Sequence, residues 1–134
     1  MEVFDIVTDE RTTDMPDADE LLHMNREVFS ERDPEKRRQA IERTYAEDVR
    51  FIDPESESVG QQALNDRAQK ILDDAPADFV LEEDGPKYVS ADTAAQAWRF
   101  GPPGSPVVRG IDILTVSDGR VSVVRTLIGS RADA

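Results

Sequence analysis

The sequence predicts an α+β domain in which three helices are followed by an antiparallel sheet. Apolar residues recur at helical spacing up to Asp74, and beyond Pro76 their period falls to two. Turn signals separate the later apolar runs: Gly-Pro-Pro-Gly at 101–104 and Ser-Asp-Gly at 117–119. A chain that places its helices first and a meander of strands last is typical of an α+β fold, with the helices covering one face of the sheet.

The three expected helices have recognisable starts. The first covers residues 17–31 and begins among acidic residues, which stabilise a helix N-terminus. The second begins at Pro34, because Asp33 is a suitable N-cap and proline costs nothing at the first helical position. The third covers residues 61–74. Their apolar stripes consist of Leu21, Leu22, Met24, Val28 and Phe29 in the first, Ala40, Ile41, Thr44 and Tyr45 in the second, and Leu64, Ala68, Ile71 and Leu72 in the third.

One strand is expected between the second and third helices. It runs from Val49 to Asp53 and ends before Pro54, which donates no hydrogen bond. The later strands are expected at 79–81, 88–89, 93–100, 107–116 and 121–128. We expect a single domain over residues 1–134. The apolar patch at 3–7 belongs either to an N-terminal tail over residues 1–14 or to an additional edge strand.

The composition narrows the partners and the chemistry. With 29 acidic against 16 basic residues and a net charge of -13, the chain lacks the positive footprint that nucleic acids require. It has no cysteine, which excludes thiolate zinc and cysteine nucleophiles, and its single histidine argues against a metal site. A magnesium site made only of carboxylates stays open. No apolar run reaches membrane length and no signal-peptide pattern is present, so we expect a cytoplasmic protein without membrane contact.

Asp53 is an unusual residue for its position. By the period of two in a strand, it shares one face with Val49 and Phe51. A carboxylate on an apolar face is costly unless it is hydrogen-bonded, protonated or open to a cavity. Asp53 therefore lies either at the mouth of a pocket that the strand helps to enclose, or in an Asx turn with the backbone of residues 55–57.

Asp112 presents the same problem in the strand at 107–116. It alternates with Val108, Gly110, Leu114 and Val116, and aspartate is disfavoured at a strand centre. Two interpretations of Asp112 stay open. It is a buried aspartate that bonds to a helix or to an arginine, or it belongs to one wall of a polar pocket whose other wall carries Asp53.

Several short motifs, in order, resemble a known superfamily. They are the run from Tyr45 to Pro54, Gly60 at the start of a helix, Gly-Ile-Asp at 110–112, Asp-Gly-Arg-Val at 118–121 and Val-Arg-Thr-Leu-Ile-Gly at 124–129. Over residues 17–130 this pattern resembles the nuclear-transport-factor-2-like superfamily. Within the superfamily, SnoaL-like domains and ketosteroid isomerases are the nearest groups.

The resemblance implies a cone-shaped, cystatin-like fold. Three helices would pack in a strongly curved antiparallel sheet around an internal pocket for a small apolar ligand, commonly in a homodimer. It also implies a cofactor-independent isomerase or cyclase that moves a proton alpha to a carbonyl group. In that chemistry Asp53 corresponds to the base, and Asp112 to a neutral acid that donates a hydrogen bond to the enolate oxygen.

The chain departs from the isomerase pattern at the first helix, which lacks the tyrosine that serves there as a second oxyanion donor. Asn25 stands at the equivalent place, with His23 close in sequence. An amide or a neutral imidazole can donate a hydrogen bond instead. Phe51, Trp98 and Phe100 are the aromatic residues expected to line the pocket.

Three hypotheses about function stay open. The chain is an acid–base enzyme, a non-catalytic ligand-binding domain with the same pocket, or an interaction module whose exposed sheet face forms a homodimer or binds a partner. Single residues also have simpler interpretations: His23 as a partly buried helix residue, Trp98 as a dimer contact and Phe51 as core packing.

Overall fold

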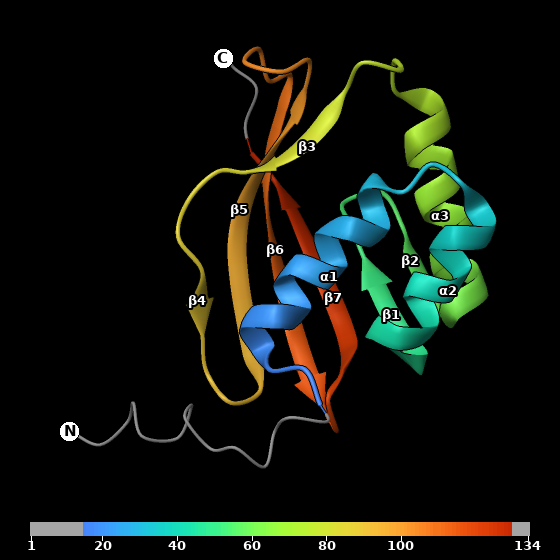
Figure 1. Ribbon diagram of the computed structural model, residues 1–134, viewed down its shortest axis with the longest axis vertical. Helices are drawn as coiled ribbons and strands as arrows, with labels where there is room; N and C mark the ends of the chain where they lie inside the picture. The colour runs from blue at the N-terminus through green and yellow to red at the C-terminus, as the bar shows by residue number, and fades with distance from the viewer. Residues whose placement is uncertain (1–14, 130–134) are drawn as a thin grey trace.

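The computed structural model describes residues 15–129, which form three helices and seven strands (Figure 1). The apolar patch at 3–7 lies outside the described residues, so its assignment to a tail or an edge strand stays a prediction. Within residues 15–129, no helix is long and apolar enough to cross a membrane.

The helices begin where the capping residues place them. In α1 (Ala18–Ser30) the Asp17 side chain accepts a hydrogen bond from the backbone N–H of Glu20. Asp33 caps α2 (Pro34–Thr44) in the same way, and Pro34 occupies the first helical position. The third helix, α3 (Gln61–Asp74), follows Gly60, whose φ of 96° favours glycine. All three helix predictions are confirmed to within a residue at their starts.

The strands agree with the prediction except near the second helix. Tyr45 ends α2 as its C-cap and also begins the first strand, which therefore starts four residues earlier than expected. The polar segment after Pro54 contributes a short strand that the sequence analysis left out. The strands are β1 (Tyr45–Ile52), β2 (Glu57–Val59), β3 (Val80–Glu83), β4 (Tyr88–Val89), β5 (Thr93–Gly101), β6 (Val108–Ser117) and β7 (Arg120–Ile128).

The sheet has the order β2-β1-β7-β6-β5-β3, with β4 also paired to β5. Neighbouring strands are antiparallel except β1 and β7, which run parallel. The expectation of a wholly antiparallel sheet is corrected by this pair. Turn signals report only strands that are adjacent in sequence, whereas β1 and β7 are separated by most of the chain, so no turn indicates their relative direction.

The helices lie against one face of the curved, open sheet (Figure 1). Their apolar stripes and the inward residues of β1, β6 and β7 form one core. Its most deeply buried aliphatic members are Leu21, Val28, Ile41, Val49, Leu64, Leu114, Val121 and Val124. This core occupies one end of the space between helices and sheet, and the site described below occupies the other.

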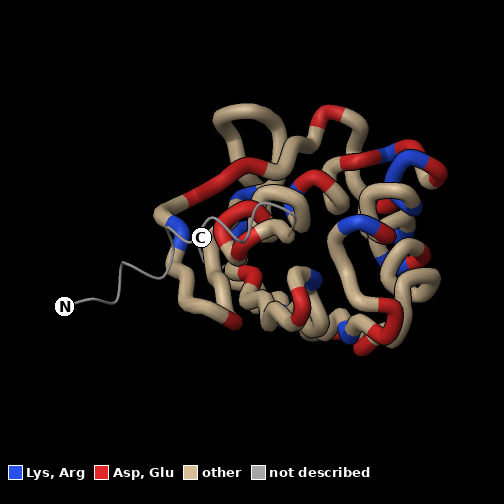
Figure 2. Tube along the Cα trace, turned by 60° about the horizontal axis from the view of Figure 1, so that its bottom comes forward, with Lys and Arg blue, Asp and Glu red and all other residues tan. Residues whose placement is uncertain are grey.

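Acidic residues are spread over the described helices, strands and loops, with Lys and Arg interspersed among them (Figure 2). Six of the eleven arginines in residues 15–129 are paired with carboxylates, as in the exposed ion pairs of Arg38 with Glu35 and of Arg50 with Glu57. Exposed pairs of this kind add little stability. An arginine that faces a cavity instead of solvent is therefore a feature that needs its own explanation.

Candidate active site

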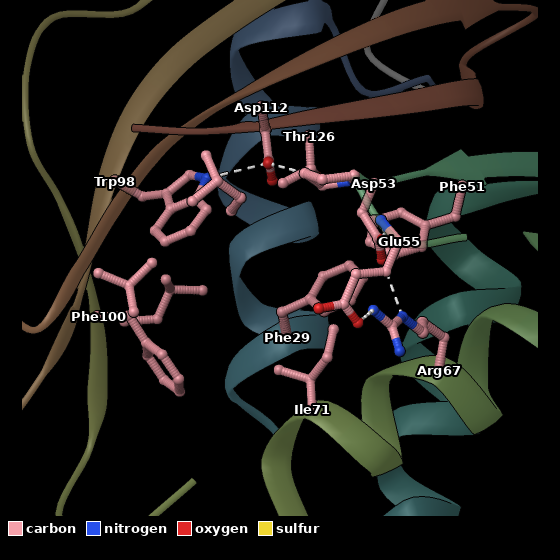
Figure 3. Close-up of a pocket in the computed structure, with 14 residues that line it drawn as sticks. Phe29, Phe51, Asp53, Glu55, Arg67, Ile71, Trp98, Phe100, Asp112 and Thr126 are labelled. Atoms are coloured by element: carbon pink, nitrogen blue, oxygen red, sulfur yellow. Dashed lines mark hydrogen bonds and ion pairs between the residues drawn. The ribbon is translucent and has the colours of Figure 1, made fainter. Parts of the chain in front are cut away.

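A cavity of about 420 Å³ lies between the sheet, α1 and α3 (Figure 3). This volume is in the range of pockets for small molecules. The apolar part of its wall consists of Phe29, Phe51, Ile71, Leu81, Trp98, Phe100, Val108 and Ile128, together with Pro54. The rings of Phe29 and Phe51 stack with their centroids 5.1 Å apart. The polar part consists of Asp53, Glu55, Arg67, Asp112 and Thr126.

Asp112 projects into the cavity from the centre of β6 and is held by three donors. Trp98 Nε1 and Thr126 Oγ1 both donate to Oδ1, at 2.9 and 2.8 Å. Asn25 Nδ2 donates to Oδ2 at 2.8 Å. Each carboxylate oxygen can accept two hydrogen bonds, so Oδ1 is saturated. Oδ2 keeps one acceptor position free of any partner among the described residues.

Gly110 makes the Trp98 contact possible. Trp98 on β5 lies directly across from Gly110 on β6, two residues before Asp112 on the same face. A Cβ atom built on Gly110 would stand 2.4 Å from the indole ring and 2.5 Å from the carbonyl oxygen of Leu127. The absence of a side chain there lets the indole lie across β6 and brings Nε1 to Asp112.

The surroundings of Asp112 raise the pKa of its carboxyl group. The largest cause is burial, which penalises the charged form. The hydrogen bonds from Thr126, Trp98 and Asn25 favour the carboxylate but do not outweigh burial. Asp112 thus takes up a proton more readily than an ordinary aspartate does, and the free acceptor position places that proton on Oδ2.

Tyr45 fixes the orientation of the Asn25 amide. Its hydroxyl donates to Asn25 Oδ1 at 2.5 Å, and both residues are buried. Burial, and secondarily the charge of Asp112, raise the pKa of Tyr45 well above its usual value, so the hydroxyl stays protonated. With Oδ1 occupied as an acceptor, the amide nitrogen of Asn25 must point toward Asp112.

We expect Tyr45→Phe to raise the pKa of Asp112. Without the hydroxyl, Asn25 is free to turn its oxygen toward Asp112 and accept a proton from it, which favours the neutral acid. The variant should also lose about 1 kcal/mol of unfolding free energy, because a buried amide oxygen loses its donor. Carboxyl-carbon NMR measures the pKa, and an unchanged value would contradict the orienting role. Phe29→Leu is a control that alters the cavity wall without touching this hydrogen-bond chain.

Asp53 lies at the end of β1 in both of its predicted environments. Its Oδ1 accepts hydrogen bonds from the backbone N–H groups of Glu55 and Ser56, at 2.8 and 3.0 Å, so the predicted Asx turn is confirmed. Its Oδ2 accepts from Arg67 Nε at 2.8 Å on the cavity wall. Burial raises the pKa of Asp53, but the hydrogen bonds from Arg67, Glu55 and Ser56 together outweigh it and hold the pKa below the usual value.

The two carboxyl groups face the same cavity from different strands (Figure 3). Strand β7 lies between β1 and β6, and Thr126 on β7 is the partner of Asp112 in the register. Two strand spacings separate Asp53 from Asp112 by roughly 10 Å at the backbone. Their environments move the two pKa values in opposite directions, so Asp53 holds its ionised form more firmly than an ordinary aspartate, whereas Asp112 holds its proton more firmly.

Arg67→Met should destabilise the fold by about 2 kcal/mol at neutral pH. The Asp53 side chain is only 6% exposed, and the substitution removes the counter-ion of this buried carboxylate. Since the folded-state pKa of Asp53 is lowered, its contribution to stability is present above the unfolded value of about 3.9 and is lost as the pH falls through the folded value. The difference between wild type and variant should therefore shrink in acid.

Urea unfolding at neutral pH and at about pH 3 measures this difference. Arg50→Met is a matched control, because Arg50 pairs with Glu57 at a similar distance of 2.7 Å but both side chains are exposed. We expect a much smaller loss in the control. Equal losses in the two variants, or a loss that does not depend on pH, would contradict the described role of Arg67.

The structure brings most of the predicted site residues together. Phe51, Trp98 and Phe100 line the cavity with the two aspartates. Asn25 lies behind Asp112, outside the main cavity, and reaches the site only through its hydrogen bond. His23 departs from its predicted place: its side chain is 55% exposed and pairs with Glu27 on the outer side of α1. It stands one residue beyond the apolar pair at 21–22, and this turns it away from the cavity.

Three residues that hold the predicted site residues in place were not themselves predicted as site residues. The Tyr45 hydroxyl was predictable in principle, because a buried tyrosine needs a partner. Thr126 is a polar residue between Val124 and Ile128 on an inward strand face, like Asp112 beside it. Arg67 lies on the apolar stripe of α3, four residues before Ile71. Within residues 15–129, no group of three His, Cys, Asp or Glu side chains is placed to hold a metal ion.

Comparison with known proteins decides the family. The family model described as SnoaL-like domain matches residues 12–124, which is most of the chain. The chain belongs to the SnoaL-like domain family. The predicted resemblance is therefore confirmed at the level of the family. None of the curated proteins with which this SnoaL-like domain was compared matches it in sequence.

Solved structures share the fold of this SnoaL-like domain. A SnoaL-like family protein from Agrobacterium tumefaciens is 22% identical with a TM-score of 0.77, over 82% of this chain and 95% of that one. A candidate polyketide cyclase from Sinorhizobium meliloti is 22% identical with a TM-score of 0.64, over 86% and 97%. A candidate ketosteroid isomerase from Kribbella flavida is 21% identical with a TM-score of 0.63, over 82% and 76%. These likenesses confirm the predicted cone-shaped fold.

Proposed function

We propose that this SnoaL-like domain is a cofactor-independent acid–base enzyme, an isomerase or cyclase, that moves a proton alpha to a carbonyl group of a small apolar compound. The observation that carries the proposal is the state of Asp112. It faces an apolar cavity, its pKa is raised, and one acceptor position of Oδ2 is open. A carboxyl group with a raised pKa inside an apolar pocket is suited to general acid–base catalysis.

The proposed first step uses the ionised form of Asp112. Oδ2 takes a proton from the carbon next to the carbonyl, which leaves an enolate in the cavity. The same oxygen then returns the proton. In an isomerisation the proton goes to a different carbon of the substrate. In an aldol cyclisation the enolate carbon adds to a second carbonyl, and the proton goes to the alkoxide that this addition forms. Atoms and charges balance in both cases without a cofactor.

The hydrogen-bond donors of the site favour the cyclisation. An isomerase must stabilise a full enolate charge with donors that are free to bind the oxyanion. Beside Asp112, the donors Trp98 Nε1 and Thr126 Oγ1 already donate to Asp112 itself. An aldol cyclisation passes through the same enolate, but the second carbonyl traps the enolate and Asp112 then neutralises the alkoxide directly, so the enolate charge need not persist until a carbon is reprotonated.

We assign the proton transfer to Asp112 and not to Asp53. The lowered pKa of Asp53 makes it a weak base, and it already accepts three hydrogen bonds. This assignment departs from the roles that the isomerase resemblance implies. In our proposal Asp53 holds the Arg67 side chain in place on the cavity wall.

The test is proton exchange in an apolar ketone dissolved in deuterated buffer. Alpha-tetralone is a suitable probe, and proton NMR follows the loss of its signal alpha to the carbonyl. Trp98, the single tryptophan of the chain, reports binding because it lines the cavity. We expect quenching of Trp98 fluorescence together with accelerated exchange. Quenching without acceleration would overturn the enzyme proposal in favour of the ligand-binding alternative.

A second candidate function is supported by the opposite face of the sheet. Ile111 and Leu127 are partners across β6 and β7, and their side chains are 42% and 46% exposed. They alternate with Asp112 and Thr126, so they point away from the cavity. An apolar pair on an open sheet face is suited to association with a second copy of the chain.

If this face forms a homodimer, Ile111→Lys should convert the dimer to a monomer, because it would bury an unpaired charge in the interface. Light scattering at micromolar concentration measures the mass. Val59→Lys is the control, since Val59 is 60% exposed and lies on the edge strand β2, which does not pair with β6 or β7. A wild-type monomer at that concentration would contradict the proposal.

A further inference from the structure

The cavity contains one basic side chain among its described lining residues, Arg67. It projects from α3 and is only 18% exposed. In a chain with a net charge of -13, the other described lining residues include three carboxylates and no other ionised group. A guanidinium group that lines a cavity instead of facing solvent indicates a function beyond surface pairing.

Two different partners bind the Arg67 guanidinium. Nε donates to Asp53 Oδ2 at 2.8 Å, and Asp53 is itself fixed by two backbone N–H groups. Nη2 donates to Glu55 Oε1 at 3.3 Å, and the Glu55 side chain is 81% exposed. Nη1 makes no hydrogen bond to any residue in the range 15–129. The first partner orients the guanidinium, whereas the second is a longer contact with an exposed side chain; Figure 3 draws both contacts.

We propose that Arg67 is the binding site for a carboxylate of the ligand, which replaces Glu55 on the outer edge of the guanidinium. The Nη1 and Nη2 groups of arginine match a carboxylate in a two-point contact, and Glu55 already shows that a carboxylate reaches this edge. The inference rests on the proposed function, because it names the class of substrate that the same cavity would accept.

The charge balance is compatible with an anionic ligand in this acidic protein. When the ligand carboxylate enters, Glu55 is released to solvent, so the number of negative charges in contact with Arg67 does not change. An exposed pair such as that of Glu55 contributes little and is readily displaced. The incoming carboxylate can bind Nη1 as well as Nη2, whereas Glu55 contacts Nη2 alone.

The position of Arg67 also sets the shape of the substrate. Arg67 is bonded to Asp53, which is separated from Asp112 by two strand spacings, roughly 10 Å. The stacked rings of Phe29 and Phe51 belong to the same cavity wall. The structure therefore points to an amphipathic keto acid, whose apolar body lies between a carboxylate at Arg67 and the carbonyl that reacts at Asp112.

Two fluorescent probes of nearly equal shape test the inference. Pyrenebutyrate carries a carboxylate and pyrenebutanol a hydroxyl, and energy transfer from Trp98 to pyrene reports binding in the cavity. We expect the intact chain to bind pyrenebutyrate about tenfold more tightly than pyrenebutanol, as a charge-assisted hydrogen bond implies. Glu55→Gln should widen this preference several-fold, because it removes the competing carboxylate while leaving Arg67 and Asp53 in place.

Arg67→Met should weaken pyrenebutyrate binding more than pyrenebutanol binding, so that the preference between the two probes is lost. Should Arg67→Met not fold, Glu55→Gln decides alone. Equal binding of both probes by the intact chain, or no change of preference in Glu55→Gln, would overturn the carboxylate site and leave the proposed function standing. Failure of both probes to bind would overturn the ligand cavity, and with it the proposed function.

Discussion

Asp112→Asn should slow the exchange of the ketone alpha proton by about 10² to 10⁴-fold, the usual contribution of a general acid–base group. The asparagine oxygen still accepts the hydrogen bonds of Trp98 and Thr126, and only the bond from Asn25, which lies outside the main cavity, is lost, so the cavity should keep its shape. The amide nitrogen, however, neither takes nor returns a proton at the position of Oδ2. Ketone binding, followed by Trp98 fluorescence, should therefore change little while the exchange rate falls.

Asp53→Asn is the matched control for this prediction. It replaces the other cavity carboxylate by the same isosteric amide, and we expect a much smaller loss of rate per folded molecule. The comparison separates our assignment from the roles that the isomerase resemblance implies. If Asp53→Asn slows exchange as much as Asp112→Asn does, Asp112 is not the sole proton-transfer group and the assignment is wrong.

Gly110→Ala should destabilise the fold by about 3 kcal/mol, because its Cβ would stand 2.4 Å from the Trp98 ring and 2.5 Å from a backbone oxygen. The oxygen belongs to the neighbouring strand and cannot move away cheaply, so the indole must shift. We expect the shift to break the hydrogen bond from Trp98 Nε1 to Asp112. The pKa of Asp112 should then rise further, since one of the bonds that favour its charged form is lost.

Urea unfolding measures the first effect, and carboxyl-carbon NMR measures the second. Gly85→Ala is a suitable control, because the nearest atom to its Cβ is 3.9 Å away, an ordinary contact. The control should change the unfolding free energy by no more than about 0.5 kcal/mol. A Gly110→Ala variant as stable as the control would show that the packing of Trp98 across β6 is not as described.

The sequence predicted the elements whose signals are local. Asp33 and Pro34 mark the start of α2 through the geometry of a single turn, and the glycine turn at 117–119 marks the hairpin of β6 and β7. The parallel pairing of β1 with β7 was not predictable in this way. It depends on contacts between residues far apart in the chain, which no short pattern reports.

The candidate site was predictable where a residue conflicts with its surroundings. Asp53 and Asp112 stood out because carboxylates on apolar strand faces are costly, and both line the cavity. Arg67 and Tyr45 did not stand out, because an arginine in a helix and a tyrosine at the end of an apolar stripe are both common. Only the tertiary fold shows that their polar ends meet Asp53 and Asn25.

The central claim is that the pKa values of Asp112 and Asp53, which face one cavity, are shifted in opposite directions from the ordinary value of an aspartate. A carboxyl-carbon NMR titration of Asp112 and Asp53 tests it most directly, and it requires no knowledge of the substrate. We predict that Asp112 titrates above the ordinary value of about 4 and that Asp53 titrates below it. If both groups titrate at the ordinary value, the carboxylates are structural and the acid–base function is contradicted.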